Sequence, residues 1–173
     1  MTTWTAPEAH RVPEPKTGDE RRMLQGWLDW HRQTLLSKCA GLTAEQLRTA
    51  SVEPSNLTLL GLVRHMAEVE RGWFRQFAAG DRDLPSLYSS PENRDGEFDD
   101  VAEADAEADF AAFHDELKLA DAAVADLPLE SERPGRQGPI SLRWVYQHMI
   151  EEYARHNGHA DLLRERIDGV TGD

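Results

Sequence analysis

The sequence contains very little cysteine, and this bounds the chemistry that the chain can perform. Cys39 is the only cysteine among 173 residues. An intramolecular disulfide and a cysteine-based metal knuckle are therefore both excluded. A chain of this kind is typical of a reducing compartment, so we expect a cytoplasmic protein.

Long apolar runs and basic clusters are also missing. No run approaches the roughly 18 consecutive apolar residues that a membrane span requires. Residues 1–16 lack the basic start and apolar core of an export signal. The net charge is −13, from 32 acidic and 19 basic residues, and would repel nucleic-acid backbones and anionic membranes. Neither nucleic acid nor a membrane is an expected partner.

Several common catalytic motifs are absent as well. The sequence has no glycine-rich phosphate loop, no Gly-x-Ser-x-Gly elbow and no His-Glu-x-x-His run. These absences remove the nucleotide-binding, serine-hydrolase and zincin classes, and leave other metal-dependent chemistry open.

What the sequence does contain is four long segments with helical spacing of apolar residues. Their expected bounds are residues 19–41, 57–80, 101–127 and 142–167. The acids of the third segment are expected on a solvated face. Ser55 and Ser141 are expected N-caps, Gly169 is an expected helix end, and Thr43 with Gln46 has the spacing of a capping box. The fold class is therefore all-α.

The length and the links between these segments predict how the chain is organised. A chain of 173 residues has the usual size of one domain. We expect an irregular arm at 1–18, a helical bundle at 19–168 and a short tail at 169–173. Residues 81–100 are long enough to cross one end of a bundle, which predicts a four-helix bundle with a long crossover between its second and third helices.

A stripe of candidate metal ligands lies on the fourth predicted helix. His148, Glu152, His156 and His159 fall within about 80° of one helical face. Glu152 and His156 are four residues apart, so both can bind one ion. His65 is the candidate third ligand, because it lies in the most apolar helix, where a buried imidazole needs a partner. Periodicity alone leaves open whether His65 is a ligand or a satisfied core histidine.

Two segments resemble the DinB superfamily: EYARHNGHADLLRE at residues 152–165 and LVRHMAEVERGWF at residues 62–74. The resemblance implies a four-helix bundle with one divalent metal ion, bound here by His65, Glu152 and His156. Many members have histidine at the position of Glu152, and the His-Glu-His pattern here resembles that of mycothiol-dependent maleylpyruvate isomerase. Zinc is the expected metal. Nickel, iron and manganese are alternatives, because a carboxylate ligand also suits harder ions than imidazole does.

The resemblance also implies a function for such a site. Three protein ligands leave a coordination position open, as in catalytic zinc sites. The implied activity is a thiol-dependent S-transferase or isomerase that uses mycothiol or bacillithiol and acts on a small electrophile. A non-catalytic metal-binding or stress-associated module and a metal-dependent hydrolase, with Glu151 as a weak candidate base, are alternatives. His148, His159 and Glu68, whose carboxylate could accept from the His65 ring, are candidate supporting residues. Members of the family are often dimers, so the resemblance is also consistent with a homodimer.

Overall fold

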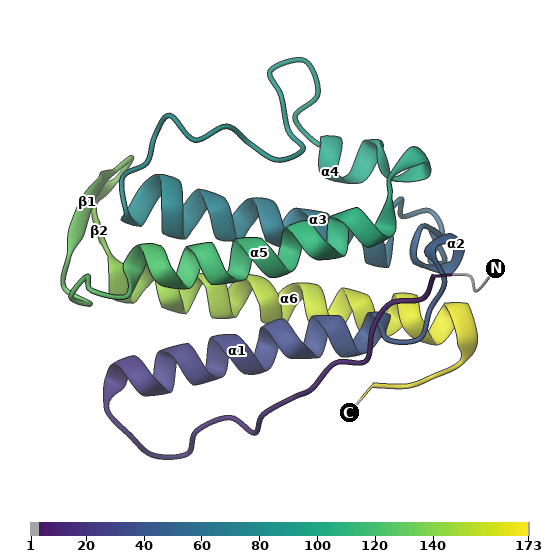
Figure 1. Ribbon diagram of the computed structural model, residues 1–173, viewed down its shortest axis with the longest axis horizontal. Helices are drawn as coiled ribbons and strands as arrows, with labels where there is room; N and C mark the ends of the chain where they lie inside the picture. The colour runs from purple at the N-terminus through teal and green to yellow at the C-terminus, as the bar shows by residue number, and fades with distance from the viewer. Residues whose placement is uncertain (1–3, 173) are drawn as a thin grey trace.

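The computed structural model describes residues 4–172 and is a helical bundle with one small hairpin (Figure 1). Helix α3 continues directly as the π-helix η1, so the two form one long rod. The elements are α1 (Glu20–Cys39), α2 (Ala44–Leu47), α3 (Leu59–Glu70), η1 (Arg71–Ala78), α4 (Gly96–Asp99), the 3-10 turn η2 (Val101–Glu103), α5 (Ala106–Val124), β1 (Glu132–Gly135), β2 (Gly138–Ser141) and α6 (Leu142–Asp168). The expectation of a helical four-helix bundle is confirmed.

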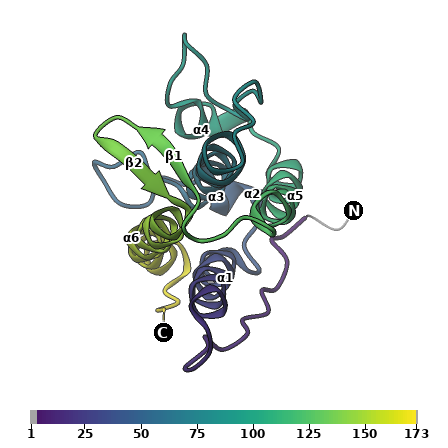
Figure 2. The ribbon, with the colours of Figure 1, turned by 90° about the vertical axis from the view of Figure 1, so that its left-hand side faces the viewer.

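The four long helices of the described chain form a ring in the order α1, α6, α3 with η1, and α5 (Figure 2). Ion pairs between the helices show their relative directions. Arg143 at the start of α6 pairs with Glu20 at the start of α1, which makes α1 and α6 parallel. Arg64 on α3 pairs with Asp109 near the start of α5, so these helices are parallel too. A parallel pair joined in sequence needs a long connection, and residues 79–105, which include the crossover predicted at 81–100, form it.

Local chemistry explains most helix ends. Thr43 and Gln46 form the predicted capping box at α2. Ser141 caps α6, and Gly169 ends it with a φ of 80°, a conformation that glycine adopts without steric cost. Ser55 is not the cap of α3; Thr58 holds that position and accepts a hydrogen bond from the backbone N–H of Gly61.

The hairpin is an element that the sequence pattern did not predict. Residues 128–140 were expected to be a loop, yet β1 and β2 pair antiparallel, with Pro134 opposite Pro139. Each strand has only four residues, and proline cannot donate to the ladder, so the usual strand signals are weak. The hairpin covers the ends of η1 and α6 at one end of the bundle.

The acidic side of α5 is only partly solvated, which corrects the expected solvated face. Asp109 and Glu116 are buried. Asp109 accepts from Arg64, and Glu116 accepts from Arg71 and Arg75 on η1. These pairs hold α5 against the long α3–η1 rod because a buried carboxylate needs a cationic partner.

Two further observations concern the ends of the described chain and its hydropathy. Near the N-terminus, Thr5 forms a bridge with Thr43, and Trp4 packs edge-on against Phe110 at 5.5 Å. No helix within residues 4–172 is both long enough and apolar enough to cross a membrane. The division into an arm (1–18), a bundle (19–168) and a tail (169–173) stays a prediction.

Candidate metal centre

Two neighbouring antiparallel helices bring the three predicted ligands together. His65 lies on α3, and Glu152 and His156 lie one turn apart on α6. One candidate ligand atom from each of the three lies within 4.8 Å of the other two. Nε2 of His156 is 3.4 Å from Oε2 of Glu152, and the two histidine rings are 4.8 Å apart between centroids. The donor set and its spacing fit one divalent ion.

The three side chains are partly buried, and this affects their protonation. The exposed fractions are 21% for His65, 24% for Glu152 and 13% for His156. Burial, with further contributions from the neighbouring histidines, lowers the pKa of His156 to about 4. The imidazole is therefore neutral around pH 7, which is the form that binds a metal. The residual exposure keeps the three side chains accessible to solvent.

Each histidine of the triad has a polar contact at Nδ1. Nδ1 of His65 is 3.1 Å from Oε1 of Glu97, and Nδ1 of His156 is 3.3 Å from Nδ1 of His159. A ring that donates from Nδ1 presents a lone pair at Nε2. Ligating histidines commonly have such an outer partner, which sets the tautomer and the ring orientation. The Glu97 carboxylate, an acceptor, thus favours binding through Nε2 of His65, and Nε2 of His156 already faces Glu152.

The prediction that Glu68 supports His65 is wrong. The Glu68 carboxylate instead accepts hydrogen bonds from the backbone N–H groups of Leu87 and Tyr88. Spacing along a helix suggested Glu68, but its side chain turns toward the crossover loop. Glu97, which takes its place, comes 32 residues after His65, and no local signal in the sequence marks it.

Buried polar contacts hold the segment that carries Glu97. The Arg64 guanidinium donates to the backbone carbonyl oxygens of Gly96 and Glu97. A Cβ on Gly96 would lie 2.3 Å from the Tyr88 carbonyl oxygen, so this close approach requires glycine. Glu97 is itself buried, and its Oε2 has no partner among the described residues. The crossover loop therefore delivers a fixed carboxylate to the candidate metal site.

A second group of possible ligands overlaps the first. His148, Glu151 and Glu152 also offer ligand atoms within 4.8 Å of one another. All three come from one helix, Glu151 is exposed, and it forms an ion pair with Arg155. The pairing leaves Glu151 a poor candidate base for hydrolysis. We favour the set with His65 because it joins two helices and is more buried.

A comparison with known protein families gives a match over most of the chain. The family model described as mycothiol-S-transferase (MST) matches residues 23–169, which is most of the chain and includes all the candidate ligands. Neither a curated protein nor a solved structure matches the chain.

Proposed function

Because the chain belongs to the mycothiol-S-transferase family, a DinB-like family, we propose that it joins the thiol of mycothiol to a small electrophile at a divalent metal ion bound by His65, Glu152 and His156. One observation carries the assignment of the site: the three ligand atoms come from two different helices and gather in a partly buried position.

The proposed chemistry divides between the ion and the protein. A bound divalent ion would keep a coordinated thiol in its thiolate form at neutral pH. His65 and His156 would present neutral Nε2 atoms, and Glu152 would supply one negative charge. Glu97 would hold the His65 ring in the ligating tautomer, and His159 contacts the His156 ring at Nδ1.

The reacting thiol has to come from outside the chain. Cys39 is the only cysteine, and its side chain is fully buried. Burial raises the pKa of the Cys39 thiol to about 12, so it is not a nucleophile at neutral pH. A small-molecule thiol is therefore needed, and the family implies mycothiol. Zinc is the ion we propose, with nickel, iron and manganese as alternatives for this donor set.

The direct test is conjugation of mycothiol to a simple alkylating electrophile such as 2-chloroacetamide. We expect a rate above the uncatalysed one, its loss after removal of metal by a chelator, and its return on addition of zinc. Bacillithiol in parallel tests the choice of thiol. A chain that unfolds on chelation but accelerates neither reaction would contradict the proposal and favour a non-catalytic metal-binding module.

A substitution of Glu97 tests whether its contact with the His65 ring strengthens metal binding. Glu97→Gln is expected to weaken zinc binding about 10–100-fold, the usual effect of losing an outer partner of a ligating histidine. Competition with a chromogenic chelator measures this affinity. Glu92→Gln, on an exposed glutamate of the same loop, is the control and is expected to bind zinc like wild type. Equal affinities in the two variants would contradict the role of Glu97.

A further inference from the structure

The hairpin end of the bundle has a hollow that the metal site does not include. It has a volume of about 420 Å³, and it lies between the hairpin and the π-helix η1. Its lining is mostly apolar, with Trp73 and Phe77 on η1 facing Ile140 on β2. A second hollow of about 330 Å³ shares Gln137 and Ile140 with it. Volumes of this order are usual for small-molecule sites.

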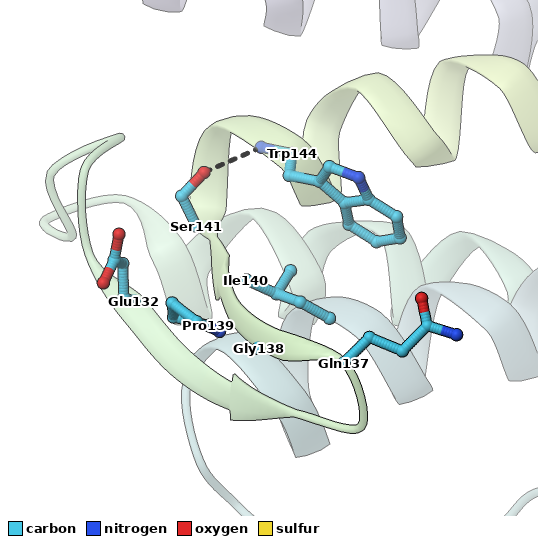
Figure 3. A pocket seen from close by; sticks show the side chains of 7 residues that line it. All are labelled: Glu132, Gln137, Gly138, Pro139, Ile140, Ser141 and Trp144. Carbon is cyan, nitrogen blue, oxygen red and sulfur yellow. Dashed lines mark hydrogen bonds between the residues drawn. The ribbon is translucent and has the colours of Figure 1, made fainter.

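Trp144 forms a wall of the second hollow and is unusually accessible. The side chains of Trp144, Ile140 and Gln137 extend toward the same side of the hairpin (Figure 3). Trp144 is 42% exposed, and its ring lies 5.3 Å from that of Trp73 between centroids. The two indoles therefore connect the hollows, which offer aromatic faces to a ligand.

One side chain separates this aromatic wall from the proposed metal ligands. His148 stacks on Trp144 at 4.7 Å with an interplanar angle of 18°, and Trp73 meets the same ring edge-on at 4.8 Å. Nε2 of His148 is 3.5 Å from Oε1 of Glu152. A ligand held by the tryptophans would thus be separated from Glu152 by the His148 side chain. Trp73 and Phe77 belong to a π-helical segment, a conformation frequent at functional sites.

We propose that the hollows at Trp73, Phe77 and Trp144 bind an aromatic group on the electrophile, one side chain away from the Glu152 carboxylate of the proposed metal centre. This inference rests on the proposed function, and it adds a substrate class: electrophiles that carry a neutral, planar, apolar substituent. Mycothiol carries sugar hydroxyls, which need many hydrogen-bond partners, so the apolar walls suit the electrophile better. Gln137 and Arg136 at the hairpin turn provide a polar rim.

A matched pair of electrophiles tests this preference. N-Benzyl-2-chloroacetamide and 2-chloroacetamide have the same reacting carbon and differ by the benzyl group. In both, the thiolate sulfur bonds to the CH₂ carbon, chloride leaves with the electron pair of the C–Cl bond, and the thiol proton passes to solvent. We expect kcat/KM to favour the benzyl compound, and Trp144→Ala to reduce the ratio of the two kcat/KM values about 3–10-fold.

A binding measurement that needs neither thiol nor turnover separates this inference from the proposed function. N-Benzylacetamide, which has no leaving group, is titrated into the protein by ligand-observed NMR. Trp144→Ala is expected to weaken binding about 3–10-fold and Trp144→Phe to retain it. Trp27→Ala, on an exposed tryptophan of α1 outside the hollows, is expected to bind like wild type.

The outcomes are distinct. Equal binding of N-benzylacetamide by wild type and Trp144→Ala, or no binding by either, would overturn the aromatic site even if mycothiol transfer occurs. If Trp144→Ala binds N-benzylacetamide more weakly than wild type while Trp144→Phe and Trp27→Ala do not, the aromatic site is supported. This holds even if no mycothiol transfer is found, a result that would contradict the proposed function.

Discussion

Replacing Glu70 by leucine is expected to lower the free energy of unfolding by about 3–5 kcal/mol, the usual effect of removing one partner of a buried ion pair. Glu70 is fully buried and accepts two hydrogen bonds of 2.7 Å from the Arg32 guanidinium. It also accepts from the hydroxyl of Tyr153. The variant leaves the buried arginine without its main counter-ion. For a chain of this size the midpoint of thermal unfolding should fall by roughly 6–20 °C.

Two further variants show whether the buried pair itself causes the loss. Asp29→Ala removes an exposed carboxylate of the same arginine and is expected to cost less than about 1 kcal/mol. Arg32→Met combined with Glu70→Leu removes both charges and should recover much of the stability lost in Glu70→Leu. Chemical denaturation of the four proteins measures these differences. A Glu70→Leu protein as stable as Asp29→Ala would contradict this account of the core.

His156→Ala is expected to give the largest loss of function. Removing an outer partner of a ligating histidine commonly costs about 10–100-fold, and removing the ligand itself should cost more than about 100-fold in metal affinity and in kcat/KM for mycothiol transfer. Nearby Arg155→Ala removes an exposed side chain that pairs with Glu151 and should leave both quantities near wild type. Zinc affinity is measured by competition with a chromogenic chelator, and kcat/KM at the zinc concentration that saturates wild type, after circular dichroism has confirmed the fold. Near-normal turnover by folded His156→Ala would contradict the proposed centre.

The helices and the local part of the site were predictable because they depend on short-range rules. The caps at Thr43, Ser141 and Gly169 follow from residue type and position. Glu152 and His156 share a helical face because a spacing of four residues is almost one turn. The apolar surroundings of His65 directed attention to it, and the DinB resemblance joined it to the other two. The family match confirms that resemblance.

The missed features depend on contacts between distant segments. Glu97 reaches His65 only because Arg64 and a glycine hold the crossover loop against α3. The hairpin has prolines in both strands, so propensity argued against it. The ion pair between Arg32 and Glu70 joins residues 38 positions apart. Such pairs are set by tertiary packing, which hydropathy patterns do not encode.

The most direct test of the central claim is the metal content of untagged, zinc-loaded protein by elemental mass spectrometry. His65 and His148 discriminate between the two overlapping groups of possible ligands, since Glu152 belongs to both. We expect about one equivalent of zinc in wild type and in His148→Ala, and loss of the ion from folded His65→Ala. Zinc retained by His65→Ala, or lost from His148→Ala instead, would contradict the centre formed by His65, Glu152 and His156.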